Sequence, residues 1–418
     1  MARHGLIVTY YFPPAGGGGV QRWIKFIKYL SRLGWRFTVI TAQVEKSNPL
    51  DPSFLDELPS DITIVRSSET QTRAGWLGRI RSRLSGSYWL RWLSAWYYVT
   101  DSRIGWNKMA ATNIQQQIEQ TKYDVIIFSS PPYSLARLAT SVAASKQQPV
   151  PVCLDMRDPW TINPYKIYPT PFHGFWDKKR EKQSIAGVPL IISAYRSTID
   201  HYRDCIPHFN PANCLYLPNG YDEEDFINLP EYRLAPADHC HIAFSGSFYS
   251  HLNKPDVLFT ALSKLKNRGI KIHFHHFGES VYDVSKLAKS FDLQDQFHKW
   301  GYQSHRECLK KLQAMNAYVL ILNEGIKNAD KTIGGKVYEY LRLRKPILAL
   351  IPEQGEAARL IRDTDSGIIC SGLKIDSVIE ALTVIYLKQR RFTFKNIEQY
   401  DRYRQARQLQ QFFEEKLA

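Results

Sequence analysis

The stretch Lys331–Pro346, KTIGGKVYEYLRLRKP, indicates the fold more clearly than any other part of the sequence. It lies between two apolar runs, Ala317–Asn323 and Ile347–Ile351, that are typical of buried parallel strands. Two glycines and a lysine open the intervening helix, which carries Glu339. Anion binding is favourable where a strand and a glycine loop lead into a helix N-terminus, because free backbone N–H groups point at the anion. The pattern predicts a site for a nucleotide-diphosphate donor, with Lys336 supplying a charge and Glu339 on the same helix face.

The composition describes a basic globular chain of more than one domain. Its 418 residues are too many for one core, and its net charge of +15 predicts an anionic partner such as nucleic acid, acidic lipid or a phosphorylated small molecule. The six cysteines show no metal-ligand spacing, so we expect reduced thiols and no metal site. The N-terminus lacks a signal-peptide pattern, and no apolar run reaches the length of a membrane span. We therefore expect a cytoplasmic protein.

A second glycine-rich loop follows the first predicted strand, Gly5–Phe12. It consists of four consecutive glycines, Gly16, Gly17, Gly18 and Gly19, and precedes a helical pattern over Val20–Leu33. The loop lies at the carboxyl end of a strand, where open α/β sheets bind ligands. It lacks the spacing of a dinucleotide site, so we favour close approach of a substrate to the backbone over a merely tight turn.

A group of charged residues follows another predicted strand, Pro151–Leu154. Two acids, Asp155 and Asp158, flank Arg157 at the strand end. Either acid could bind acceptor hydroxyls or act in acid–base catalysis, and Arg157 could hold a phosphate or one of the acids. The alternative is a buried ion pair followed by a proline turn. We favour the catalytic interpretation because of the position at the strand end.

The stretch Arg73–Lys108 is basic and rich in tryptophan, with six arginines, five tryptophans and one acid. Trp89, Trp92 and Trp96 share one helical face, as in amphipathic segments that lie in an anionic lipid interface. The alternative is that the tryptophans pack into the core and the arginines form a solvated face. Nucleic-acid binding is less favoured, because no helix-turn-helix, zinc or RNA-recognition signature accompanies the charge.

The alternation of strands and helices restarts after an acidic, irregular stretch at 223–237, which we interpret as a linker. We expect two Rossmann-like α/β domains, over 1–222 and 238–385, with an active site in the cleft between them. A polar helical tail, 386–418, is expected to pack back on the first domain, and its composition predicts that it is too polar for a core.

Six ordered segments resemble the group 1 nucleotide-sugar glycosyltransferases: YYFPPAGGGGVQR, DMRDPW, LPNGYDEEDF, FSGSFYSHLNK, HKWGYQSHRE and KVYEYLRLRKPILAL. That family has the GT-B fold of two facing Rossmann-like domains and transfers sugars with retention of configuration. The resemblance implies that the first domain binds the acceptor and the second the donor. It implies donor contacts from Gly16, Gly17, Gly18, Gly19, Gly246, Ser247, Lys254, Tyr302, Gly335, Lys336 and Glu339. It implies no metal or other cofactor, because lysines and backbone N–H groups can neutralise the leaving diphosphate.

The sequence departs from the family pattern at two positions in the predicted donor site. Lys331 stands where the family's first glutamate, which contacts the donor sugar, is expected, and Glu324 is another acid of the same loop. Ser247 stands where relatives often carry a basic residue, which leaves Lys254 as the only base of that loop.

We therefore expect a transferase that moves a sugar to a glycan or lipid-linked acceptor in polysaccharide biosynthesis. It would work in the cytoplasm, peripherally on the inner face of the plasma membrane through Arg73–Lys108, without nucleic acid as a partner. The alternatives are a nucleotide-sugar 2-epimerase, which shares the fold, and a noncatalytic subunit that binds sugar nucleotides.

Overall fold

The structure, a computed structural model, describes residues 3–44, 50–68, 88–145, 150–249 and 253–417. These residues form two compact units. Unit 1 comprises Met1–Asn219 and Arg402–Ala418, and unit 2 comprises Gly220–Asp401. The stretch 223–237, predicted as a linker, therefore belongs to unit 2. None of the helices in the described part of the chain is long and apolar enough to cross a membrane.

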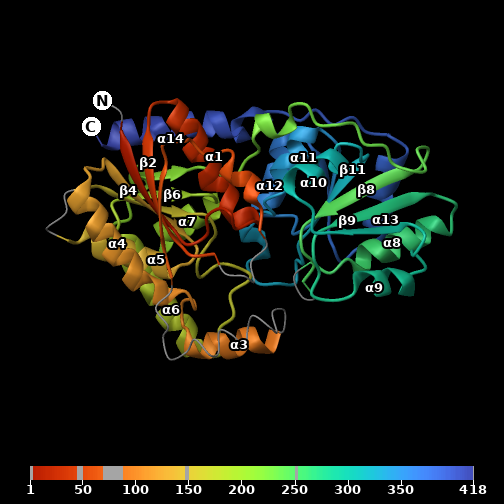
Figure 1. Ribbon diagram of the computed structural model, residues 1–418. Coiled ribbons are helices and arrows are strands. Elements are labelled where there is room, and N and C mark those ends of the chain that lie inside the picture. Colours follow the sequence, from red (N-terminus) through yellow and green to blue (C-terminus); the bar gives the residue numbers. More distant parts are fainter. Residues whose placement is uncertain (1–2, 45–49, 69–87, 146–149, 250–252, 418) are drawn as a thin grey trace. The chain divides into compact units, whose positions relative to one another are not determined.

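Unit 1 is built on a seven-stranded parallel sheet of order β3-β2-β1-β4-β5-β6-β7 (Figure 1). The order reverses between β1 and β4, which makes the carboxyl ends of these strands the expected ligand side. The central strands are buried along nearly their whole length, as apolar parallel strands covered on both faces should be. The strands are β1 His4–Thr9, β2 Arg36–Ala42, β3 Thr63–Ser67, β4 Val125–Ser130, β5 Val152–Met156, β6 Leu190–Ser193 and β7 Cys214–Tyr216.

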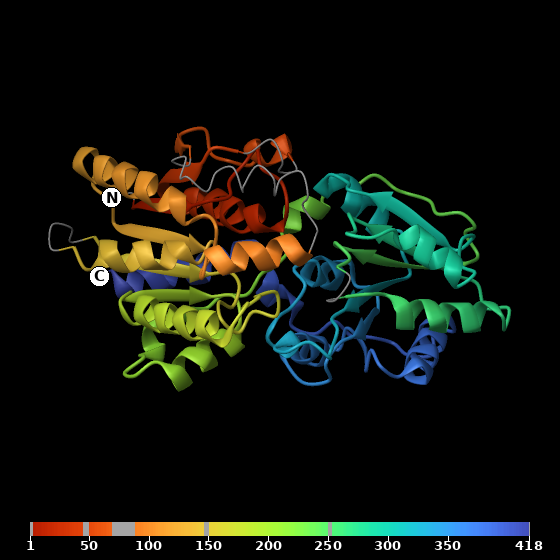
Figure 2. The ribbon, with the colours of Figure 1, turned by 90° about the horizontal axis from the view of Figure 1, so that it is seen from below.

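Helices cover both faces of this sheet. On one face α1 (Gly18–Arg32) packs beside α14 (Arg402–Lys416) (Figure 1). On the other lie α4 (Asn107–Gln120) and α5 (Ser134–Ala143), drawn in orange and yellow in Figure 2. The other helices in the described part of unit 1 are α3 Tyr88–Tyr97, α6 Pro171–Ala186 and α7 Arg196–Cys205.

The C-terminal tail contributes to the core, so the prediction that it is too polar for a core was wrong. Ala406, Leu409, Phe412 and Phe413 of α14 are buried in one cluster with residues of α1. They recur at helical spacing and form a single apolar stripe, which the low overall hydrophobicity of the segment conceals.

Unit 2 is built on a six-stranded parallel sheet of order β10-β9-β8-β11-β12-β13, which reverses between β8 and β11. Its strands are β8 Cys240–Ser245, β9 Ile272–Phe277, β10 Phe297–Gly301, β11 Ala317–Ile321, β12 Ile347–Leu350 and β13 Gly367–Cys370. Its helices are α8 Asp256–Lys266, α9 Val284–Ser290, α10 His305–Leu312, α11 Val337–Leu343, α12 Glu356–Thr364 and α13 Ile375–Tyr386. The helices α8, α9 and α13 bury their apolar sides against one face of the sheet.

A chain of hydrogen bonds between histidines crosses the other face of β8, β9 and β10. The Nε1–H of Trp300 donates to Nδ1 of His275 at 3.1 Å. The Nε2 atom of His275 lies 2.9 Å from Nδ1 of His241, whose own Nε2 lies 2.9 Å from the carbonyl oxygen of Pro236. Because Nδ1 of His275 accepts from Trp300, the proton of His275 is on Nε2, which donates to Nδ1 of His241. Because a carbonyl oxygen can only accept, His241 in turn donates through its Nε2, and both rings are neutral.

The stretch Arg73–Lys108 does not form one continuous amphipathic element. Residues 73–87 lie outside the described residues. Trp106 is completely buried and donates to Ser67 Oγ at 3.0 Å, so it is a core residue, as the alternative interpretation predicted. Trp96 in α3 is 47% exposed.

Candidate functional site

The start of α11 positions a carboxylate with one free oxygen. Glu339 is only 6% exposed, and its Oε1 accepts hydrogen bonds from Lys336 Nζ and His305 Nε2, each at 3.0 Å. No described residue donates to Oε2, which is also buried. A buried carboxylate oxygen without a donor costs free energy. Glu339 Oε2 is thus ready to accept a hydrogen bond from a ligand hydroxyl.

Electrostatics keep this carboxylate ionised. Burial opposes ionisation of Glu339, but the charges of Lys336 and His305 outweigh burial and lower its pKa to about 2. Behind His305, the Oδ2 atom of Asp225 lies 3.8 Å from its Nδ1. Lys336, His305 and Asp225 thus hold Glu339 in one charge state and one orientation.

Sequence reasoning assigned no role to His305. It is the first residue of α10, shortly after the end of β10, and this position at the carboxyl end of a strand was the available signal. Its pairing with Glu339 could not be predicted, because 34 residues separate the two along the chain.

The loop before α11 is open, and the helix is firmly attached to the sheet. A Cβ atom at Gly335 would have no neighbour within 4 Å among the described residues. The Tyr340 hydroxyl accepts a hydrogen bond from the backbone N–H of Ser245 at 2.7 Å, and its ring stacks on Tyr318 with centroids 4.3 Å apart. The structure thus brings Gly335, Lys336 and Glu339 together on one rigid support beside the end of β8.

The backbone of Gly246 lies in a close contact that requires glycine at position 278. Gly246 has a φ of +153°, and Gly278, with a φ of +136°, lies so near that a Cβ there would be 2.4 Å from the carbonyl oxygen of Gly246. His276 Nε2 donates to the same carbonyl at 2.9 Å. The neighbouring Ser247 is half-buried, and its carbonyl accepts a hydrogen bond from Asn253 at 2.8 Å.

The structure places two predicted donor contacts on the surface. Lys254 is 47% exposed, and its Nζ lies 2.8 Å from Asp256 Oδ1. Tyr302 is 46% exposed, and its backbone N–H donates to Glu279. The donor contacts of Lys254 and Tyr302 therefore stay predictions.

Lys331 and Glu324, the two residues weighed at the family's first glutamate position in the loop before α11, each have polar partners. Lys331 Nζ lies 2.8 Å from Asp330 Oδ2. Glu324 Oε1 accepts from Ser371 Oγ at 2.5 Å and from the backbone N–H of Leu373 at 3.1 Å. Glu324 therefore holds the loop that follows β13.

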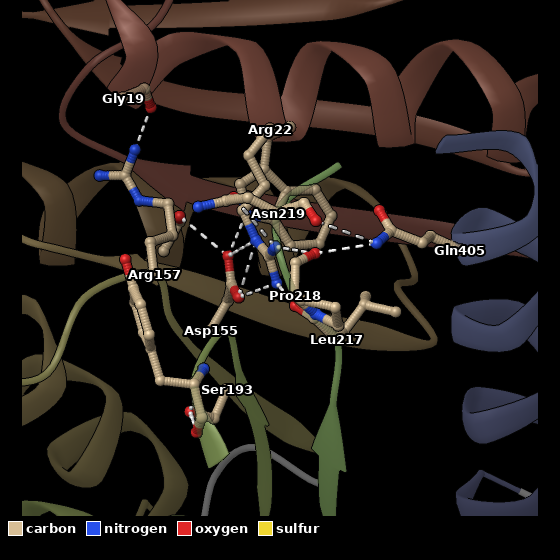
Figure 3. Close-up of polar contacts among 12 residues, drawn as sticks. Gly19, Arg22, Asp155, Arg157, Ser193, Leu217, Pro218, Asn219 and Gln405 are labelled. Atoms are coloured by element: carbon tan, nitrogen blue, oxygen red, sulfur yellow. Dashed lines mark hydrogen bonds and ion pairs between the residues drawn. The ribbon is translucent and has the colours of Figure 1, made fainter. Parts of the chain in front are cut away.

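In unit 1, Asp155 forms a buried ion pair with Arg22 of α1 (Figure 3). The distance between Arg22 Nη2 and Asp155 Oδ1 is 2.9 Å, and Asp155 is fully buried. Its Oδ2 also accepts from Trp23 Nε1 at 2.8 Å. Arg22 donates further to the carbonyl oxygens of Leu217 and Pro218, at 2.9 and 3.2 Å. An ion pair was the alternative interpretation of Asp155, but the partner is Arg22 and not Arg157.

Arg157 joins the first turn of α1 to the loop after β4 at the carboxyl edge of the same sheet. Its Nη1 donates to the carbonyl oxygen of Gly19 (Figure 3). Its Nη2 donates to the carbonyl oxygen of Pro131. Gly18 and Gly19 already belong to α1, so Gly16 and Gly17 alone form the loop, and Gly17 needs its φ of +97°. Arg157 thus fixes the start of α1, directly after the glycine loop, relative to the loop after β4.

Asp158 remains available for a ligand. It is partly exposed, and no hydrogen bond or ion pair joins it to another described residue. Burial raises its pKa above the ordinary value for an aspartate. Of the two acids at this strand end, Asp158 is the one whose oxygens are not already occupied.

Comparison with known proteins identifies the fold. No family model and no curated protein matches the sequence. The lipopolysaccharide outer core galactosyltransferase WaaB matches with a TM-score of 0.64, at 11% identity over 99% of both chains. Sucrose-phosphate synthase of Thermosynechococcus elongatus matches with a TM-score of 0.70, at 12% identity over 99% of both chains. HepE of Anabaena, solved with UDP and glucose, matches with a TM-score of 0.63, at 12% identity over 99% of this chain and 100% of its own.

These similarities extend over nearly the whole chain and include both parallel sheets. The predicted fold class, two Rossmann-like α/β domains of the GT-B type, is therefore confirmed. At such low identity the similarity establishes the fold, while the chemistry depends on the residues described above.

Proposed function

We propose that the protein is a glycosyltransferase that moves a sugar from a nucleoside-diphosphate donor to a glycan or lipid-linked acceptor in polysaccharide biosynthesis. One observation carries the proposal: the unpartnered, buried Oε2 of Glu339 beside the cation of Lys336. A carboxylate oxygen suits a ribose hydroxyl, and a lysine suits a phosphate. The complex of HepE with UDP and glucose supports a donor of this kind on the shared fold.

The donor side of the reaction belongs to unit 2. Glu339 accepts a hydrogen bond from the ribose, and Lys336 with the backbone at Gly335 faces the diphosphate. As the bond between the sugar's anomeric carbon and the diphosphate oxygen breaks, negative charge grows on that oxygen. Lys336 stabilises this charge in the transition state, so no metal or other cofactor is required.

The acceptor side belongs to unit 1. Asp158 binds the acceptor hydroxyl, whose oxygen forms the new bond to the anomeric carbon while its proton passes to the departing diphosphate. The product keeps the configuration of the donor. Asp155 and Arg157 act indirectly, since Asp155 anchors α1 through Arg22 and Arg157 holds the start of α1 at Gly19.

A thermal-shift screen of the purified protein against UDP, GDP, CDP, ADP and their sugar conjugates tests the proposal. A ligand that binds only the folded state raises the melting temperature. We expect one nucleotide to do so in the wild-type protein and to have a smaller effect on Glu339→Gln. No shift with any nucleotide would contradict a donor site of this type.

A noncatalytic sugar-nucleotide-binding subunit is the second candidate, and the pairing of Lys331 with Asp330 favours it. This pair occupies the loop position where the resemblance implies a glutamate on the donor sugar. Such a protein would bind the nucleotide selected by the screen but release no nucleoside diphosphate with any acceptor. A 2-epimerase would convert the donor without an acceptor, and no residue of the site favours it.

We also propose that the protein works in the cytoplasm, peripherally on the inner face of the plasma membrane, where a lipid-linked acceptor would lie. The net charge of +15 supports attraction to anionic lipid. Sedimentation of the protein with vesicles that contain anionic lipid tests this location.

A further inference from the structure

Two helices of unit 1 together expose a group of large apolar side chains. Leu93, Trp96 and Tyr97 of α3 and Phe172 and Phe175 of α6 are each between 45% and 66% exposed. The two helices touch here, since the rings of Trp96 and His173 have centroids 5.1 Å apart and His173 Nε2 lies 3.3 Å from the carbonyl oxygen of Trp96. Figure 1 shows α3 beside the start of α6. We call these five exposed residues the aromatic edge.

A row of lysines continues the aromatic edge along α6. Lys178, Lys179 and Lys182 are exposed, and they lie three or four residues apart from Phe175 or from one another, which places them on adjoining parts of the helix surface. Lys179 Nζ lies over the ring of Trp176, 4.8 Å from its centroid. The same side of α6 thus changes from aromatic to basic along the helix.

The acids of α6 point the other way. Asp177 and Glu181 are buried, and they are used inside the protein: Asp177 accepts from Trp160 Nε1 at 3.1 Å and Tyr168 at 2.9 Å, and Glu181 accepts from Thr161. The helix α3 contains no acid. Within α3 and α6, no carboxylate is therefore exposed to oppose the charge of the lysines.

We infer that the aromatic edge and the lysine row of α6 form a docking surface for an anionic lipid bilayer. Aromatic side chains partition into the boundary between lipid headgroups and acyl chains. Lysines beside them attract lipid phosphates electrostatically. The charge complementarity to an anionic surface selects a bilayer over a neutral apolar partner. This inference rests on the proposed function and deepens it: membrane contact is assigned to α6 together with α3, the helix within the predicted stretch Arg73–Lys108.

Co-sedimentation of the full chain with sucrose-loaded vesicles tests the inference. The vesicles contain phosphatidylcholine alone or with about one-third phosphatidylglycerol. The test variants are K178Q/K179Q/K182Q and F172S/F175S. The matched control is K264Q/K286Q/K289Q, which removes the same charge from exposed lysines of α8 and α9 in unit 2.

We expect the wild type and the control variant to bind only the anionic vesicles. Removing the three lysines of α6 should weaken binding on the order of 100-fold, because each basic residue near such a surface contributes about fivefold. Removing the two phenylalanines should weaken binding about tenfold or more. Equal binding by all variants would overturn the inference, as would wild-type protein that ignores the anionic vesicles.

Analytical ultracentrifugation in the absence of lipid examines the competing occupant. A wild-type dimer that F172S/F175S converts to monomer would assign the aromatic edge to a second copy of the chain and overturn the bilayer surface. The thermal shift with the selected nucleotide is measured on the same variants. It should be unchanged, so loss of vesicle binding can be told apart from failure of the proposed donor site.

Discussion

The substitution Asp155→Asn should destabilise unit 1 strongly, because it removes one charge from a buried ion pair. Asparagine keeps the shape of the side chain and one acceptor oxygen. It leaves the guanidinium of Arg22, which is 2% exposed, without its counter-charge. The hydrogen bonds of Arg22 to the carbonyl oxygens of Leu217 and Pro218 remain, but they do not neutralise the cation.

Neutralising one partner of a buried ion pair typically costs about 3–5 kcal/mol. Since asparagine retains one acceptor, we expect the lower end, about 3 kcal/mol, for the loss in the free energy of unfolding. For a unit of this size, 1 kcal/mol shifts the melting temperature by about 2–4 °C. The expected decrease in melting temperature is therefore roughly 6–12 °C.

Urea denaturation followed by circular dichroism measures this loss, with Asp158→Asn as the matched control at the same strand end. Asp158 has no ion-pair partner among the described residues, and burial already disfavours its charge, so its replacement should cost less than about 1 kcal/mol. If Asp155→Asn were as stable as Asp158→Asn, the ion pair would not anchor α1, and Asp155 would again be a candidate for catalysis.

Three further results are expected. Gly278→Ala should destabilise unit 2 by about 2 kcal/mol or more, measured by urea denaturation, because its Cβ would lie 2.4 Å from the carbonyl oxygen of Gly246 at a positive φ. Lowering the pH from 7 to 5 should reduce the free energy of unfolding of unit 2 by about 1–2 kcal/mol through His275. Burial lowers the pKa of His275 in the folded protein to about 2, so the folded state stays neutral at pH 5. In the unfolded chain a histidine takes up a proton below about pH 6.5, which favours unfolding. The variant His275→Gln, whose amide can both donate and accept, should flatten this pH dependence, and an unchanged slope would contradict the neutral histidine chain. His305→Ala should weaken binding of the selected nucleotide about tenfold in calorimetry by releasing Glu339, while His305→Gln should retain more of the affinity.

The fold was largely accessible from the sequence, because buried parallel strands are continuous apolar runs. The segments at 317–323 and 347–351 are strands β11 and β12 with the helix α11 between them, as predicted. The last helix was misjudged, because its four buried apolar residues are few among many polar ones. These four residues are buried because α1 packs against them, and the sequence pattern of α14 alone does not show where α1 lies.

The candidate site was only partly accessible. Gly335, Lys336 and Glu339 are close in sequence, so helical spacing alone brings them together. Long-range partners were not predictable: Arg22 is 133 residues from Asp155, and the sequence offered Arg157 as the nearer cation. Spacing rules describe one element at a time, whereas these pairs form where several strands end at the same edge of a sheet.

The most direct test of the donor site compares two ligands on two proteins by titration calorimetry. The ligands are the nucleoside diphosphate selected by the screen and its 2′,3′-dideoxy analogue, and the proteins are wild type and Glu339→Gln, with Glu307→Gln as an exposed control on α10. A hydrogen bond to a charged group contributes about 1.5–3 kcal/mol, so the wild type and the control should prefer the ribose form about tenfold or more. In Glu339→Gln, whose neutral amide makes a weaker hydrogen bond than the carboxylate, this preference should fall several-fold. An equal preference for ribose in wild type and Glu339→Gln would show that Glu339 does not bind the ribose and would contradict the assignment of the donor site.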